Sequence, residues 1–263
     1  GGTGTFGKNF ISYLFKNHNP RKVIVYSRDE MKQYEMAKNF VQLDESKLPK
    51  TKGKNIDGFR FYAVEDKHYP SITTVLGAIP KPGLMKWRKS VGEDAAKWEM
   101  NRAARRGSAT HTLVEQYLKG ETPSIRDVLP LGMFRLLKPY LDQVDNIHCL
   151  ETIMYSNKLT VAGQVDCIAE YNGKLSVIDF KTANKERVDS WNENYYIQCT
   201  AYAIMYEELF DTAIEQIVIL QAGEDGSAKA FVKNKADYEE KLGKAIKDFY
   251  KYYEEKTKGT IKS

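Results

Sequence analysis

The sequence predicts a mixed α/β domain in which a central, mostly antiparallel sheet is flanked by helices. Strand-like runs rich in Val, Ile and Tyr alternate along the chain with segments of helical periodicity. Hydrophobic residues make up 42% of the 263 residues, which is enough for a sizeable core. Asn172 and Gly173 separate two strand-like runs, and Asn-Gly is the strongest short-range signal for a hairpin, because both residues tolerate positive φ.

The elements up to this hairpin are predicted from residue type and from the positions of proline and glycine, which end helices and strands. Pro70 and Pro80 bound a short helix, and a long helical region follows with a break near Gly107 left open. Apolar residues on both faces of the two hairpin strands place those strands centrally in the sheet. In chain order we predict a strand at 59–64, helices at 71–79, 93–119 and 131–144, and strands at 150–156, 161–171 and 174–180.

The elements after the hairpin complete the sheet and its cover. Periodicity predicts a strong helix, and two strand-like runs joined by a Gly-containing turn come next. A last amphipathic helix exposes Lys and Glu to solvent. The predicted ranges are a helix at 194–210, strands at 216–221 and 228–232, and a helix at 236–255.

The first 40 residues follow a different pattern from the rest. A Gly-rich turn, an amphipathic helix at 8–17 and a strand at 22–26 are predicted there. Gly2, Gly4 and Gly7 fit the spacing G-x-G-x-x-G, which brings a pyrophosphate close to a helix N-terminus, but the strand that should precede the turn is absent. We therefore predict a partial Rossmann-like segment at 1–40, a Lys-rich linker at 41–58 and one domain at 59–263.

Charge and cysteine content restrict the classes of function. The net charge is +5, and residues 1–40 carry seven basic and three acidic side chains, so the remainder is nearly neutral and any DNA site must be local. Cys149, Cys167 and Cys199 lack Cys-x-x-Cys spacing, which argues against zinc, an iron–sulfur cluster or a disulfide framework. No apolar run has the length of a membrane span and no signal peptide is evident, so we expect a cytoplasmic protein.

The hairpin register predicts where four polar residues meet. A two-residue turn places Asp166 opposite Asp179 and Gln164 opposite Lys181. Carboxylates on directly opposed residues, about 5 Å apart, repel by about 3 kcal/mol at an effective dielectric near 20. A divalent cation between them reverses that repulsion, and Mg²⁺ binds to one or two carboxylates plus substrate phosphates. The alternative is an ordinary ion pair of Lys181 with either aspartate at the strand ends.

Three ordered motifs resemble a known family. They are Gly163-Gln164-Val165-Asp166, then Asp179-Phe180-Lys181-Thr182, then Gln198-x-x-x-Tyr202. This order resembles the PD-(D/E)XK nucleases, in particular the RecB-type branch that includes phage and mitochondrial exonucleases. The resemblance covers about 59–255, including Arg106-Gly107-x-x-x-His111-x-x-x-Glu115 upstream, and departs from the family at Val165, where the name-giving proline would stand.

The resemblance implies a restriction-endonuclease-like core and a role for each motif residue. Asp166 and Asp179 would bind Mg²⁺ or Mn²⁺, with the carbonyl of Phe180 and the side chain of His111 as further ligands, and Lys181 would supply a fixed positive charge. A single helical histidine is otherwise more often structural. Glu115 lies on the same helical face as His111. Three roles are open for it: to orient the histidine, to bind a second ion, or to belong to a solvated charged face.

DNA contacts are expected around this centre. By resemblance Gln198 and Tyr202 would face the cleft and hold DNA, together with Arg106 and Gln164; the alternative for Tyr202 is a place in the core. Basic residues interleaved with an aromatic suit a single strand, although each could be an ordinary exposed charge. The other basic residues considered are Arg102, Arg105, Lys81, Lys86, Arg88 and Lys89, the last four around Trp87.

The N-terminal segment resembles the start of nucleotide-sugar 4,6-dehydratases, in which the Gly2, Gly4, Gly7 and Arg28 positions would contact NADP. The resemblance ends near Phe40. Three functions follow as hypotheses. The first is a metal-dependent DNA exonuclease that acts on single strands or free ends in phage-type replication, recombination or degradation. The others are a catalytically silent DNA-binding nuclease fold and an NADP-binding dehydratase fragment.

Overall fold

The computed structural model of the chain describes Phe10, Tyr13 and residues 41–79, 82–122, 124 and 127–260. The helix predicted at 8–17 and the strand predicted at 22–26 therefore lie outside the described residues, except for Phe10 and Tyr13. Among the described helices, none is both long and apolar enough to cross a membrane.

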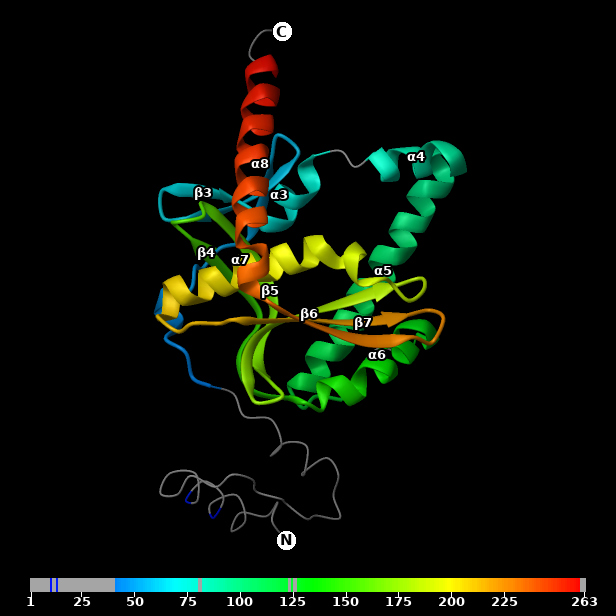
Figure 1. Cartoon of the computed structure of the whole chain (residues 1–263), viewed down its shortest axis with the longest axis vertical. Helices are drawn as coiled ribbons and strands as arrows, with labels where there is room; N and C mark the ends of the chain where they lie inside the picture. Colours follow the sequence, from blue (N-terminus) through cyan, green and yellow to red (C-terminus); the bar gives the residue numbers. More distant parts are fainter. Residues whose placement is uncertain are drawn as a thin grey trace.

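A five-stranded mixed sheet forms the centre of the molecule (Figure 1). Its strands are neighbours in chain order, and all adjacent pairs are antiparallel except the parallel pair β6–β7. This confirms the predicted mixed, mostly antiparallel sheet. The strands are β4 (Val144–Ser156), β5 (Val161–Tyr171), β6 (Lys174–Ala183), β7 (Gln216–Gly223) and β8 (Ala228–Asn234).

A three-stranded sheet packs beside it, and its strands are β1 (Gly53–Ile56), β2 (Phe59–Val64) and β3 (Lys67–Pro70). The segment predicted as a linker contributes β1 and the short 3₁₀ helix η1 (Glu45–Lys47). The N–H of Val41 also donates to the carbonyl of Ile147, at 2.8 Å. Leu43, Leu48 and Ile56 of this segment pack, partly buried, against the hydrophobic core.

Helices cover both faces of the central sheet (Figure 1). Side chains of α7 and α8 belong to the core on one face, and those of α5 and α6 belong to the core on the other. No break occurs at Gly107, and α4 and β3 were not predicted. The helices are α3 (Ile72–Ala78), α4 (Pro82–Val91), α5 (Glu93–Leu118), α6 (Val128–Leu141), α7 (Glu193–Phe210) and α8 (Glu239–Thr260), with 3₁₀ turns η2 (Asp189–Asn192) and η3 (Lys235–Tyr238).

The Asn172-Gly173 turn has the predicted backbone. The two residues have φ values of 53° and 76°, which is the left-handed region that a type I′ turn requires. The predicted register holds for five pairs, from Tyr171↔Lys174 to Cys167↔Ile178. The hairpin strands are buried on both faces, as expected for central strands.

Candidate active site

The two decisive pairs of the hairpin prediction do not form. Beyond Ile178, strand β6 has no ladder partner in β5 and pairs only with β7. The N–H of Phe180 instead donates to the Asp166 carboxylate, at 3.0 Å. This side-chain acceptor replaces the backbone acceptor that the ladder would offer, so Asp166 reaches the backbone of β6 and does not face Asp179 across a regular pair.

Gln164 also has a different partner from the predicted Lys181. It pairs with Ile153 of β4, and its side-chain amide donates to Glu151 Oε2 at 2.8 Å. Glu151 lies between residues paired with Cys167 and Val165, which places it opposite Asp166. The prediction was wrong here because it considered only the β5–β6 side of β5.

The backbone at this point departs from a regular strand. Glu151 has φ of 49°, a conformation that is uncommon for non-glycine residues and costs about 1–3 kcal/mol. Val165 and Cys167 belong to opposite core layers although a regular strand would put them on one face. Val165 and Phe180 also lie in different layers. The irregularity turns the Glu151 and Asp166 carboxylates toward α5.

Three side chains from three elements converge at the irregularity. Single ligand atoms of His111, Glu151 and Asp166 all lie within 4.8 Å of one another. His111 Nδ1 is 3.8 Å from a Glu151 oxygen and 3.6 Å from Asp166 Oδ2, while His111 Nε2 is 2.7 Å from the carbonyl oxygen of Phe180. His111, Asp166 and the carbonyl of Phe180 are thus brought together as predicted, and Glu151 joins them.

The electrostatics of this cluster favour positive charge. Burial would lower the pKa of His111, but the Asp166 and Glu151 carboxylates outweigh burial and raise it to about 9. A protonated imidazole, or another cation in its place, is therefore stabilised between the two carboxylates.

Asp179 and Lys181 form a buried ion pair beside the cluster, although Asp179 is not a member of the 4.8 Å group. Lys181 Nζ lies 2.5 Å from Asp179 Oδ2, and this ammonium is the ion-pair partner of the buried carboxylate. Burial raises the pKa of Asp179 to about 6 against the opposing effect of Lys181. Burial would lower the pKa of Lys181, but Asp179 and Asp166 outweigh it, so the pKa is raised and the ammonium stays charged.

An open cavity of about 450 Å³ leads to the cluster, and His111, Glu115 and Glu151 are among its lining residues. Glu115 lines it while paired with Lys119, at 2.6 Å. Within the part of the chain that the structure describes, Glu115 forms no hydrogen bond or ion pair with His111. Of the three roles left open for Glu115, orientation of the histidine therefore finds no support.

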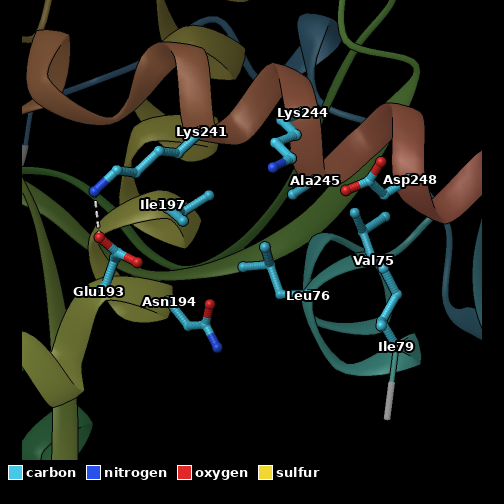
Figure 2. Close-up of a pocket in the computed structure, with 10 residues that line it drawn as sticks. All are labelled: Val75, Leu76, Ile79, Glu193, Asn194, Ile197, Lys241, Lys244, Ala245 and Asp248. Atoms are coloured by element: carbon cyan, nitrogen blue, oxygen red, sulfur yellow. Dashed lines mark hydrogen bonds and ion pairs between the residues drawn. The ribbon is translucent and has the colours of Figure 1, made fainter. Parts of the chain in front are cut away.

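A second cavity, of about 490 Å³, lies between α3, α7 and α8 (Figure 2). Its lining includes Val75, Ile197 and Lys244, and at one end Lys241 pairs with Glu193. None of its lining residues belongs to the acidic cluster.

Gln198 and Tyr202 lie beneath the site rather than in an open cleft. Both side chains are buried, and the Gln198 amide donates to Tyr202 Oη at 3.3 Å. A Cβ atom at Gly163 would stand 2.9 Å from the Tyr202 ring, so only glycine allows this approach of α7 to β5. The core alternative for Tyr202 is therefore the one observed, and the expected exposure to DNA is not.

The basic residues of α5 are also engaged within the protein. Arg106 is buried, donates to Asn184 Oδ1 at 2.9 Å and forms an ion pair with Glu224. Arg102 also pairs with Glu224, at 3.1 Å. The predicted DNA contact of Arg106 is thus replaced by an internal clamp. Of the other basic candidates, Arg105, Lys86, Arg88 and Lys89 are exposed, Arg88 pairs with Glu93, and Lys81 lies outside the described residues.

Glu151 was missed in the sequence although a signal for it existed. Ser156 pairs with Val161 across a four-residue loop, and continuing that register places Glu151 opposite Asp166. The same reasoning that was applied to the Asn172-Gly173 turn would have found it. The three cysteines are buried thiols.

Comparisons with known proteins identify the larger part of the chain. The model of the PD-(D/E)XK nuclease superfamily matches residues 85–261. Mitochondrial genome maintenance exonuclease 1 of Homo sapiens is 30% identical over 173 residues, which are 60% of this chain and 50% of that protein. The Mus musculus protein of the same name is 26% identical over 172 residues, or 60% and 51% of the two chains. The chain thus spans about half the length of these relatives.

The N-terminal part matches different proteins. A family model described as polysaccharide biosynthesis protein matches residues 1–58. The inverting UDP-N-acetylglucosamine 4,6-dehydratase of Campylobacter jejuni serotype O:2 is 58% identical over 40 residues, which are 15% of this chain and 12% of that protein. The resemblance predicted for this segment is confirmed, whereas the expected cofactor residues Gly2, Gly4, Gly7 and Arg28 lie outside the described residues.

Proposed function

This chain belongs to the PD-(D/E)XK nuclease superfamily, and from that premise we propose that it is a metal-dependent DNA exonuclease. The observation that carries the proposal is the meeting of His111, Asp166 and the carbonyl of Phe180 beside the Asp179–Lys181 ion pair. The exonuclease names of the relatives support the same activity. The process it serves, phage-type replication, recombination or degradation, stays a prediction, as does a cytoplasmic location.

The donor set fits a hard divalent cation, Mg²⁺ or Mn²⁺. Such ions prefer carboxylate and carbonyl oxygens, which Asp166, Asp179 and Phe180 offer, and His111 adds an imidazole nitrogen. Asp179 is fully buried, and burial raises its pKa even though Lys181 is its ion-pair partner, so a divalent cation would further stabilise the ionised carboxylate. A bound cation would orient the scissile phosphate and act on it as a Lewis acid.

The remaining residues act by position and charge. Lys181 keeps its proton beside Asp179 and would stabilise negative charge that develops on the phosphoryl oxygens. The N–H of Phe180 fixes the Asp166 carboxylate, and the Gln164 amide fixes that of Glu151. These hydrogen bonds hold both carboxylates in place before any ligand arrives.

Cleavage of end-labelled DNA tests the proposal. Purified protein is incubated with single- and double-stranded substrates in Mg²⁺ or in EDTA, alongside Asp179→Asn, Lys181→Ala and Asp66→Asn. Asp66 is an exposed carboxylate and serves as the matched control. We expect Mg²⁺-dependent cleavage that the two site variants lose and the control keeps. Cleavage in EDTA, or unchanged cleavage by Asp179→Asn, would contradict the proposal.

Substrate topology separates exonuclease from endonuclease action and addresses the alternatives. An exonuclease requires an end, so we expect linear single strands to be degraded and circular ones to survive. Binding of DNA without cleavage would select the catalytically silent nuclease fold. Activity that is lost on deletion of residues 1–40, together with saturable binding of NADP, would instead select the dehydratase fragment.

A further inference from the structure

Arg187 has an unusual environment for an arginine. It lies in the loop between β6 and η2, is half-buried, and donates from Nη1 to Tyr195 Oη at 3.1 Å. Its guanidinium also lies over the Tyr195 ring, 5.6 Å from the centroid. No carboxylate among the described residues pairs with it, whereas the other arginines of this region that are at least half-buried, Arg102 and Arg106, both pair with Glu224.

An arginine of this kind retains its binding capacity for an anion. A guanidinium stays charged, and taking it partly out of water without a counterion is costly unless a ligand supplies the charge. Its planar fork can donate two parallel hydrogen bonds to the two non-bridging oxygens of a phosphate, and the single hydroxyl oxygen of Tyr195 does not use this capacity in full. The unpaired state of Arg187 therefore points to an anionic ligand.

The loop that carries Arg187 is held in place by neighbouring elements. The N–H of Glu186 donates to Asp225 Oδ2 at 2.8 Å, and the N–H of Glu224 donates to the carbonyl of Ala183 at 3.0 Å. Glu186 also pairs with Lys229 of β8. Because these contacts fasten the loop to the β7–β8 turn, little order has to be gained when a ligand binds.

Tyr195 connects this arginine to the proposed catalytic lysine. Lys181 Nζ lies 4.9 Å from the centroid of the same ring that Arg187 approaches at 5.6 Å. The largest separation that the two cations can have is the sum of these distances, 10.5 Å. Neighbouring phosphate groups of one strand can bridge such a distance, and basic grooves follow a nucleic-acid backbone in this way.

We propose that Arg187 and Tyr195 form a phosphate-binding subsite for the nucleotide next to the scissile bond. The inference rests on the proposed function, since it assumes a DNA strand whose scissile phosphate lies at Lys181. Arg187 binds the neighbouring phosphodiester, while Tyr195 is a positioning residue that holds the guanidinium through its ring and hydroxyl group. The subsite would favour extended single strands, whose phosphates can follow the two cations.

Binding and cleavage measured separately test this subsite. We compare Arg187→Gln with Arg135→Gln, an exposed arginine of α6 without a carboxylate partner among the described residues. By fluorescence anisotropy in EDTA with a labelled single-stranded oligonucleotide, we expect about tenfold weaker binding for Arg187→Gln and less than a twofold change for the control. The logarithm of the association constant decreases with the logarithm of the salt concentration, and the magnitude of this slope should be smaller by about 0.7 for Arg187→Gln. That difference is the value for one phosphate contact on a single strand.

A chemically altered substrate gives a second measurement. A series of oligonucleotides carries one uncharged methylphosphonate linkage, at a different position in each. At one position, we expect the linkage to weaken binding by the wild-type protein to the affinity of Arg187→Gln. The same oligonucleotide should bind Arg187→Gln no more weakly than the unmodified one does. Tyr195→Phe, which keeps the ring and removes the hydroxyl group, should lose part of the same affinity. If Arg187→Gln unfolds at a lower temperature than wild type, Arg187→Lys replaces it and should also lose affinity, because a point charge cannot bind in the bidentate mode.

The outcomes separate the two proposals. Binding by Arg187→Gln that equals that of Arg135→Gln overturns the subsite even if the wild-type protein cleaves DNA. A wild-type protein that shows no cleavage overturns the nuclease proposal, while an affinity loss confined to Arg187→Gln would still support a phosphate site. In cleavage assays we expect the loss to appear mainly in KM, because the contact exists before and during the reaction.

Discussion

His111 Nε2 lies 2.7 Å from the carbonyl oxygen of Phe180, which stands between Asp179 and Lys181 in β6. The contact spans 69 residues of sequence and ties α5 to the strand that carries two of the three proposed catalytic side chains. Because Nε2 faces the carbonyl, Nδ1 is left facing the carboxylates of Asp166 and Glu151. Any change that shifts α5 on the sheet should therefore disturb the acidic site.

Replacing Glu151 with Gln should impair the site, although the resemblance gave it no role. The variant keeps the size of the side chain and removes one of the two carboxylates that face His111. We expect Mg²⁺ affinity or activity to fall about 10- to 100-fold, as for other residues that orient metal ligands. The concentration of Mg²⁺ that gives half-maximal cleavage measures this.

Glu115→Gln is the matched control for Glu151, because both side chains line the same cavity and Glu115 forms its ion pair with Lys119, whereas the acidic partners of His111 are Glu151 and Asp166. We expect less than a twofold change. An equal loss in both variants would mean that the cavity acts through its overall negative charge, and the specific place given to Glu151 would be wrong.

Arg106 should contribute to stability and not to DNA affinity. Removing one partner of a buried ion pair leaves the other charge uncompensated and lowers the free energy of unfolding by about 3–5 kcal/mol. Because Glu224 is partly exposed, we expect a smaller loss of about 2–3 kcal/mol for Arg106→Ala. Urea unfolding measures the loss, and Arg105→Ala, which removes an exposed arginine of the same helix, should be nearly neutral. If Arg106→Ala instead leaves the stability unchanged and strongly reduces the salt dependence of DNA affinity, Arg106 contacts DNA, as the sequence analysis predicted.

The sequence predicts most elements of this fold because their signals are local. The Asn172-Gly173 turn fixes φ at two positions, and the register follows for five residue pairs. Local reasoning fails where a side chain replaces a backbone partner, as Asp166 does when it accepts the N–H of Phe180. It also fails for α5, since only tertiary packing decides that Arg106 turns inward to Glu224 while His111 reaches β6.

Gly163→Ala should destabilise the protein by crowding the base of the site. The new Cβ would stand 2.9 Å from Tyr202 Cε1 and 3.1 Å from Ile72 Cγ2, so α7 or β5 would have to move. Overpacking of this kind costs about 1–3 kcal/mol. Gly132→Ala is the control, because a Cβ there meets nothing within 4 Å inside helix α6, and it should stabilise by up to about 1 kcal/mol. The free energy of unfolding, measured by chemical denaturation, should decrease for Gly163→Ala and increase for Gly132→Ala. Equal changes in the two variants would contradict the close approach of Tyr202 to Gly163.

His148 should make the stability of the fold depend on pH. Its Nδ1 lies 2.6 Å from Tyr206 Oη, and burial lowers the pKa of His148 against a smaller opposing effect of Glu170. The unfolded chain, with the ordinary histidine pKa of about 6.5, therefore binds the proton more readily than the folded protein. Stability from this group is complete above pH 6.5 and falls as the pH drops below it, by at most about 1.4 kcal/mol per pH unit.

His148→Gln isolates this contribution, because the amide can still bond to the hydroxyl group of Tyr206 but does not titrate. We expect the free energy of unfolding, measured by urea titration at several pH values on both sides of 6.5, to fall less steeply toward acid in this variant than in wild type. His68→Gln removes an exposed histidine and should leave the wild-type slope unchanged. If His148→Gln keeps the full acid slope, the pH dependence arises from other groups, and the contact between His148 and Tyr206 then tolerates a protonated imidazole because Tyr206 can accept its N–H.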